Sequence, residues 1–325
     1  MDLIATPKNP IPLGASVGFL AGRKGLKLRY ARWRSAVKER RGTVCIFPGR
    51  SEFIEKYFEV VGELRRRGFA VAVLDWQGQG GSSRLLRNRM KGHVRNFARY
   101  EDDLSLFMSE VVLPDCPPPY FALGHSMAGT VLLNAATDKG CWFSRMVLIA
   151  PMLTVAGLPL SQANVGRLMS AASICGFGHS MVPGGMKEYR QNQIFDGNPL
   201  TSDRERFYRN LSVLQTAPEL IVGPPTIDWV RSAIKAMRAI ESDRFPTRLR
   251  IPVLMVAAGD DRIVSSKAIE ALSFRLRVGS QILLRGARHE ILQERDAIRE
   301  QFWAAFDAFV PGSAADSVVP RSVVA

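Results

Sequence analysis

The segment 119–130, with the sequence PYFALGHSMAGT, constrains the fold of this chain most strongly. An apolar run ends in Gly124-His125-Ser126, small residues follow, and residues 130–136 have the Ala- and Leu-rich composition of a buried helix. We therefore predict a buried strand, a sharp turn and a helix, with Ser126 at the turn. A serine there adopts a strained backbone conformation that presents its hydroxyl, and its neighbours must be small. The alternative for Ser126 is an ordinary helix N-cap.

Apolar runs of strand length recur along the chain and alternate with segments of helical spacing, among them the helices expected over 53–67 and 100–113. The runs at 42–47, 69–74 and 145–150 are continuous, as expected for buried parallel strands, and 251–258 and 280–284 follow much later. Two earlier runs, 15–20 and 26–33, are joined by a glycine-containing turn typical of a hairpin. This order predicts an α/β fold with a doubly wound, mostly parallel sheet.

The alternation stops between residues 152 and 246, where short helical patterns replace strands and Gly and Pro are frequent. We expect this segment to be an inserted helical lid that walls a pocket at the carboxyl edge of the sheet. The core would then consist of residues 1–151 and 247–310. The small and polar residues 311–325 are expected to be a disordered tail.

Composition restricts the environment of the protein. Lys and Arg number 44 against 30 Asp and Glu, a formal charge of +14, which either favours anionic partners or serves solubility alone. The basic residues are dispersed and show no nucleic-acid-binding motif, so no nucleic acid partner is expected. The four cysteines form no C-x-x-C pair and no metal-ligand spacing, and the glycine-rich stretch 78–81 lacks a nucleotide-binding pattern, so neither metal nor cofactor is expected. Since the chain shows neither a membrane-length apolar run nor a signal peptide, we expect it to be cytoplasmic.

Three side chains follow predicted strands in a catalytic order. A serine hydroxyl needs a histidine to take its proton, and that histidine needs a carboxylate to orient it. His289 follows the last strand, and the adjacent Asp260 and Asp261 follow the strand before it. We expect Ser126, Asp261 and His289 to form the triad, with Asp260 as the alternative acid.

An oxyanion formed at Ser126 would need backbone donors. These normally come from the residue after the nucleophile and from the loop after the first buried parallel strand. The N–H groups of Met127 and Arg50 occupy those positions. The Arg50 side chain is open to another role, either structural or as a headgroup contact.

The chain from residue 43 to residue 309 resembles the α/β-hydrolase superfamily, and more narrowly the serine hydrolases of the monoacylglycerol lipase and bacterial lysophospholipase type. Four motifs carry the resemblance: GHSMAG at 124–129, D-x-x-G-x-G-x-S at 75–82, G-x-D-R-x-V at 259–264, and GARHE at 286–290. Two positions depart from the usual patterns, since Pro48 replaces a common histidine and Ala128 replaces the second glycine of G-x-S-x-G. The resemblance implies cleavage of carboxylic esters through an acyl-enzyme.

The basic surface favours a lipid ester substrate, a lysophospholipid or a monoacylglycerol, and peripheral contact with an anionic membrane at its inner face. Two other functions stay open. An aminopeptidase of the same fold, similar to a proline iminopeptidase, would need an acidic pocket for the substrate's amino group, with Glu188, Asp196, Glu219 or Asp228 as candidates. A non-catalytic binding module is the second alternative. The sequence sets no oligomeric state.

Overall fold

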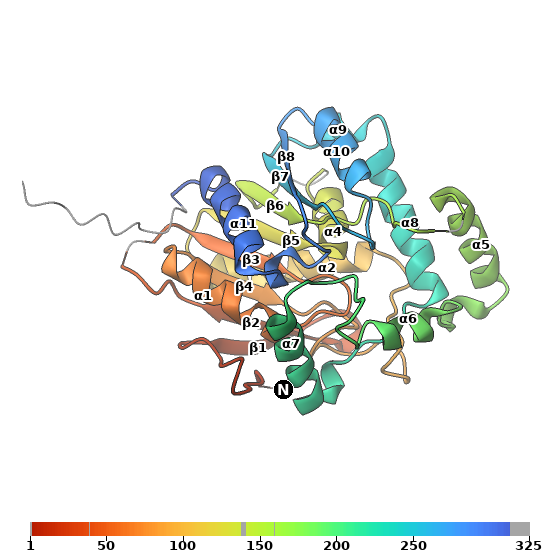
Figure 1. The fold of residues 1–325 in the computed structure, drawn as a ribbon, viewed down its shortest axis with the longest axis horizontal. Helices are drawn as coiled ribbons and strands as arrows, with labels where there is room; N and C mark the ends of the chain where they lie inside the picture. Colours follow the sequence, from red (N-terminus) through yellow and green to blue (C-terminus); the bar gives the residue numbers. More distant parts are fainter. Residues whose placement is uncertain (1, 39, 138–140, 159, 313–325) are drawn as a thin grey trace, which may run out of the picture.

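The computed structural model describes residues 2–38, 40–137, 141–158 and 160–312. One eight-stranded sheet runs through it in the order β1-β2-β4-β3-β5-β6-β7-β8. Strands β3 to β8 are mutually parallel, and the β1–β2 hairpin adds an antiparallel edge beside β4. The predicted α/β fold with a doubly wound, mostly parallel sheet is confirmed (Figure 1).

The strands lie close to the predicted ranges. They are β1 (Ser16–Ala21), β2 (Lys27–Trp33), β3 (Thr43–Phe47), β4 (Ala70–Leu74), β5 (Tyr120–His125), β6 (Arg145–Ile149), β7 (Val253–Ala258) and β8 (Gly279–Leu284). The central strands β3 and β4 are buried along their whole length, because helices cover both faces of the sheet.

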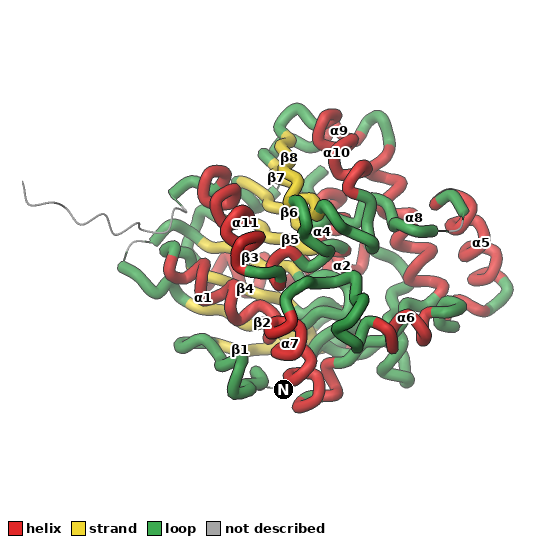
Figure 2. Tube along the Cα trace, in the orientation of Figure 1, coloured by secondary structure: helices red, strands yellow, loops and turns green. Residues whose placement is uncertain are grey.

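Successive side chains of each strand enter two different cores. Cys45 and Phe47 of β3 pack on one face with α2 (Ala98–Phe107), α4 (Met127–Ala135) and α10 (Ser266–Arg275). Val44 and Ile46 pack on the other face with α1 (Phe58–Arg66) and α11 (Asp296–Phe309). This alternation is the period of two expected of a strand, and it gives the sheet a layer of helices on each face. Figure 2 shows α1 and α11 in front of the strands.

Two predicted helices differ from the structure in detail. The helix expected over 53–67 starts with a 3₁₀ turn, Ile54–Tyr57, before α1 begins. The N–H of its first residue, Ile54, donates a hydrogen bond to the Asp75 side chain at 3.0 Å. The helix expected over 100–113 is interrupted by a π-helical segment, Met108–Val112, before the short α3 (Leu113–Asp115).

The segment between β6 and β7, called the insertion below, adds no strand to the sheet among its described residues. It contains α5 (Gln162–Ile174), α6 (Gly185–Gln191), α7 (Arg204–Thr216), α8 (Ile227–Glu241) and α9 (Phe245–Arg248). Figure 1 shows α5, α6 and α8 gathered beyond one end of the sheet, with α5 outermost. Helix α6 was not predicted, because its sequence lacks a continuous apolar stripe.

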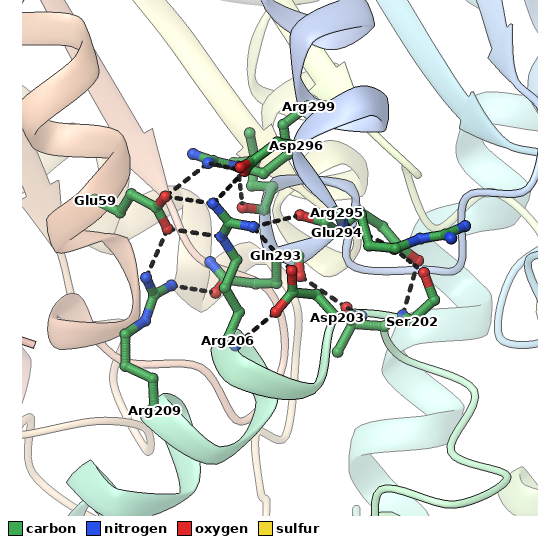
Figure 3. Close-up of polar contacts among 12 residues, drawn as sticks. Glu59, Ser202, Asp203, Arg206, Arg209, Gln293, Glu294, Arg295, Asp296 and Arg299 are labelled. Carbon is green, nitrogen blue, oxygen red and sulfur yellow. Dashed lines mark hydrogen bonds and ion pairs between the residues drawn. The ribbon is translucent and has the colours of Figure 1, made fainter. Parts of the chain in front are cut away.

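Helix α7 is fixed to the core by ion pairs. Glu59 of α1 accepts hydrogen bonds from Arg206 and Arg209 of α7 and from Arg299 of α11, at 2.6 to 2.9 Å (Figure 3). Burial alone would raise the pKa of Glu59, but its hydrogen bond from Arg206 and the neighbouring arginine charges hold that pKa at about 2. The carboxylate therefore stays charged at neutral pH, and this part of the insertion is anchored.

No helix of the described residues is long and apolar enough to span a bilayer. Most of the predicted tail, residues 313–325, lies outside the described part of the chain.

Candidate active site

Ser126 joins β5 to α4 through a strained turn. Its φ of 51° and ψ of −113° lie in a region that side chains rarely adopt. Close packing requires this turn: a Cβ on Gly124 would lie 2.4 Å from Leu132, and one on Gly129 would lie 2.6 Å from Pro151. The backbone is held in place by a 2.9 Å hydrogen bond from Ser126 N–H to the Ile149 carbonyl of β6.

The structure brings together Ser126, His289 and Asp261, which come from the carboxyl ends of three different strands. His289 Nε2 lies 3.0 Å from Ser126 Oγ, and His289 Nδ1 lies 2.8 Å from Asp261 Oδ2. The His289 side chain is 5% exposed and the Asp261 side chain is fully buried. This is the geometry in which a histidine can take the serine proton while a carboxylate fixes its tautomer. The catalytic roles of the three residues remain predictions.

Asp261, and not Asp260, faces His289. Its second oxygen accepts hydrogen bonds from the N–H groups of Ile263 and Val264, at 2.8 and 2.9 Å. Burial works to raise the pKa of Asp261, but the hydrogen bonds from His289 and the two backbone donors outweigh it and lower that pKa. Asp260 is exposed to solvent.

The two expected oxyanion donors lie at the ends of separate elements. Met127 is the first residue of α4, where a helix leaves its N–H groups unpaired. Arg50 lies in the loop after β3. Within the part of the chain that the structure describes, neither N–H donates a hydrogen bond to another protein group, so both are free to bind a substrate oxygen.

The glycine-rich loop 75–83 supports the loop that contains Arg50. Gln79 accepts a hydrogen bond from Ser51 N–H at 2.8 Å and donates one to the Gly49 carbonyl at 3.2 Å, while Trp76 donates to the Pro48 carbonyl at 2.8 Å. The glycine-rich sequence thus serves to position the neighbouring backbone.

The shape of this glycine-rich loop depends on a buried ion pair between Arg29 of β2 and Asp75. The two side chains meet at 2.7 Å and neither is exposed. Asp75 also accepts a hydrogen bond from Gly81 N–H at 2.7 Å. Gly80 has a φ of 48°, and a Cβ there would lie 2.2 Å from the Asp75 carboxylate carbon. Only glycine fits at that position.

A buried carboxylate that the sequence analysis missed lies beneath the serine. Glu52 accepts hydrogen bonds from Gly49 N–H and Tyr57 Oη and pairs with Lys56 at 2.7 Å. Burial would raise the pKa of Glu52, but the charges of His125 and Lys56 hold it well below its usual range. The four-residue spacing of Glu52 and Lys56 within an apolar helical pattern was the available signal.

His125 connects this carboxylate to the candidate triad. Its Nδ1 lies 3.1 Å from Glu52 Oε2, and its Nε2 lies 3.2 Å from the carbonyl oxygen of His289. A ring that donates from both nitrogens is the charged imidazolium. Burial would lower the pKa of His125, but the Glu52 carboxylate raises it, in agreement with that state. The residue before the candidate nucleophile therefore holds the backbone of the candidate base.

A cavity of about 370 Å³ opens at Ser126 and His289. Its wall is mainly apolar and comes largely from the insertion, with Val165 of α5, Leu211 of α7 and Trp229 and Ile234 of α8 among the lining residues. An apolar cavity of this kind suits a hydrocarbon chain.

Among the described residues of the insertion, few acidic side chains line this cavity. Of the four carboxylates proposed for an aminopeptidase, Glu188 lines it, whereas Asp196, Glu219 and Asp228 do not.

Asp228 belongs instead to a cluster outside the cavity, with His93 and His179. Their donor atoms lie within 4.8 Å of one another, and this is the one group among the described residues that could approach a metal ion together. One Asp228 oxygen already accepts a hydrogen bond from Ser173 at 2.6 Å and lies 3.3 Å from Arg231. His93 Nδ1 lies 2.8 Å from Thr226 Oγ1, so two of the three side chains already have polar partners within the protein.

Comparison with known proteins places the chain in a family. The profile of the family described as "Serine aminopeptidase, S33" matches residues 38–296, which is more than half of the chain. The chain belongs to this family of α/β-hydrolases. Among its curated relatives, lysophospholipase L2 of Escherichia coli strain K12 is 30% identical over 84% of this chain and 81% of that protein. Monoglyceride lipase of Mus musculus is 24% identical over 77% of this chain and 76% of its own length.

Solved structures with a similar fold are also found. A soluble variant of monoglyceride lipase from Saccharomyces cerevisiae, in complex with a substrate analogue, superposes with a TM-score of 0.73 at 18% identity. The match covers 93% of this chain and 98% of that one, and it supports the fold assignment.

The two adjacent aspartates allow a matched test of the acid. Asp261→Asn should lower kcat for a p-nitrophenyl ester by about 10⁴-fold, because an amide would stabilise the wrong tautomer of His289. Asp260→Asn, at an exposed position, should keep wild-type kcat. A larger loss in Asp260→Asn than in Asp261→Asn would contradict this assignment.

Proposed function

We propose that the protein is a serine hydrolase that cleaves carboxylic esters of lipids, lysophospholipids or monoacylglycerols, through an acyl-enzyme. The hydrogen-bonded chain from Ser126 through His289 to Asp261, opening into an apolar cavity, is the observation that carries this proposal. The names of the relatives, lysophospholipase L2 and monoglyceride lipase, support the substrate class.

The proposed reaction has two stages. Ser126 Oγ attacks the ester carbonyl and its proton passes to His289 Nε2, while the N–H groups of Arg50 and Met127 bind the oxyanion. The tetrahedral intermediate collapses to an acyl-Ser126 ester as His289 returns the proton to the leaving alcohol. Water, deprotonated by His289, then attacks the acyl-enzyme and releases the fatty acid and free Ser126.

An aminopeptidase reaction is less well supported by the cavity. Glu188 is exposed, and the positive charge of Arg50 lines the same cavity, which disfavours a substrate ammonium group. The family description nevertheless names an aminopeptidase, so aminoacyl amides belong among the substrates tested.

Activity and labelling together test the proposed reaction. Wild-type protein should release fatty acid from lysophospholipid or monoacylglycerol faster than it cleaves aminoacyl amides, and a fluorophosphonate probe should label Ser126. Ser126→Ala should lose the label and about 10⁴-fold or more of the esterase rate. Ester hydrolysis that survives in Ser126→Ala would refute the nucleophile, and preferential amide hydrolysis would refute the substrate class.

We also propose that the insertion acts as a lid and contacts an anionic membrane surface. Six large apolar side chains between residues 160 and 194 are exposed: Leu160, Leu168, Ile174, Phe177, Met186 and Ile194. Exposed Lys187 and Arg190 of α6 lie on the same segment. An apolar surface with neighbouring basic residues suits the interface of an anionic bilayer. Since α7 is anchored by Glu59, lid movement would involve α5 and α6.

Vesicle binding tests this contact. Ile174 is 86% exposed, so Ile174→Glu should weaken cosedimentation with phosphatidylglycerol vesicles, because a charge opposes insertion into the interface. The matched control is Phe274→Glu on α10, where Phe274 is 83% exposed but outside the insertion. Wild-type binding should also weaken as salt is raised. Equal losses in the two variants, or binding that favours neutral vesicles, would contradict the proposed surface.

A further inference from the structure

The Arg50 side chain brings a positive charge into the otherwise mainly apolar cavity. It is partly buried and lines the cavity together with Ser126 and His289. Its Nη1 donates hydrogen bonds of 2.9 Å to Ser51 Oγ and of 2.9 Å to the Gly223 carbonyl, and its Cζ lies 5.8 Å from the centre of the Trp229 ring. These contacts orient the guanidinium without neutralising it, because every one of these partners is uncharged.

No carboxylate of the described residues forms an ion pair with Arg50. Lys56, a second basic side chain of the cavity, differs in this respect, since it pairs with Glu52 at 2.7 Å and Glu290 at 2.6 Å. Burial lowers the pKa of Arg50, and the charge of the exposed Glu188 acts in the opposite direction. An arginine remains protonated at neutral pH, so the cavity wall contains a guanidinium charge that no carboxylate of the described residues pairs directly.

A partly desolvated cation that lacks an ion-pair partner is stabilised by an anionic ligand, and a guanidinium offers a planar donor pair suited to phosphate. The position of Arg50 restricts where that anion lies. Its own backbone N–H is a proposed oxyanion donor, so the ester carbonyl and the guanidinium would contact one substrate at neighbouring points. In a lysophospholipid the ester and the phosphate are at opposite ends of one glycerol unit, whereas a monoacylglycerol has a neutral hydroxyl in place of the phosphate.

We propose that the Arg50 guanidinium binds the headgroup phosphate and thereby selects lysophospholipids over monoacylglycerols. This inference rests on the proposed lipid esterase function and names the substrate within it. Two of the residues that orient the guanidinium, Gly223 and Trp229, come from the insertion, so selectivity depends on the insertion being in place.

The test compares two substrates of the same acyl chain, lysophosphatidylglycerol and monoacylglycerol, in mixed micelles of a neutral detergent. The measured quantity is the ratio of their kcat/KM values. Arg50→Gln should lower this ratio about tenfold or more, the usual effect of losing a hydrogen bond to a charged group. A ratio cancels any effect on the oxyanion site, because both esters share that site.

Three further variants sharpen the comparison. Arg50→Lys should give an intermediate ratio, because it retains the charge but not the planar donor pair. Glu188→Gln should raise the ratio, because it removes a negative charge that weakens the field at Arg50. Arg238→Gln, an exposed position of α8 outside the cavity lining, is the matched control and should keep the wild-type ratio.

Failure of this inference is distinguishable from failure of the proposed function. An unchanged ratio in Arg50→Gln, in an enzyme that cleaves both lipids, overturns the role of Arg50 alone. Wild-type protein that cleaves neither lipid overturns both. A measurement on the wild type covers the case in which Arg50→Gln does not fold: glycerol 3-phosphate should inhibit competitively at lower concentrations than glycerol, and equal inhibition by the two overturns the phosphate contact.

Discussion

The strained turn at Ser126 is the constraint on which the rest of the site depends. A backbone with φ of 51° is costly for a serine, and it persists because the packing around it leaves no alternative. Leu132 of α4 lies against Gly124, and Pro151 after β6 lies against Gly129, so larger residues at either glycine would separate the helix from the sheet. The Ser126 hydroxyl therefore lies at the carboxyl edge of the sheet, where the loops after β3, β7 and β8 also begin.

Two groups of buried charged residues position those loops. In the first group, Arg29 and Asp75 fix the glycine-rich loop, and Gln79 of that loop holds the backbone on both sides of Arg50. In the second, Glu52 and His125 connect that same backbone to the carbonyl of His289. Buried ionic groups are costly unless fully paired, and here each one has several partners. This arrangement explains why paired charged residues form part of a cavity wall that is otherwise mainly apolar.

Much of the fold followed from the sequence because its signals are local. Continuous apolar runs at β3, β4 and β6 mark strands buried on both faces, and the motif around Ser126 fixes a strand, a turn and a helix in one short segment. The choice of Asp261 over Asp260 to face His289 also agrees with the geometry, since adjacent side chains in a turn point in different directions.

The remaining features depend on contacts between distant segments. Glu52 and Arg29 are charged residues, which are usually exposed, yet both are buried. His125 and Tyr57 contact Glu52, and Asp75 pairs with Arg29. The first turn of the helix after β3 is a 3₁₀ turn, and its Ile54 N–H donates a hydrogen bond of 3.0 Å to Asp75, a contact between separate segments that no local pattern predicts. Helix α6 and the anchoring of α7 by Glu59 are likewise tertiary features without a periodic pattern in sequence.

The central claim is that Ser126 becomes acylated during turnover, and a rapid acid quench followed by peptide mass spectrometry tests it most directly. Protein mixed with excess lysophosphatidylglycerol should yield a peptide containing Ser126 whose mass is increased by the fatty acyl group, and this peptide should form and decay at rates that account for turnover. Fatty acid release without any adduct at Ser126, or with the acyl group on another residue, would contradict the account.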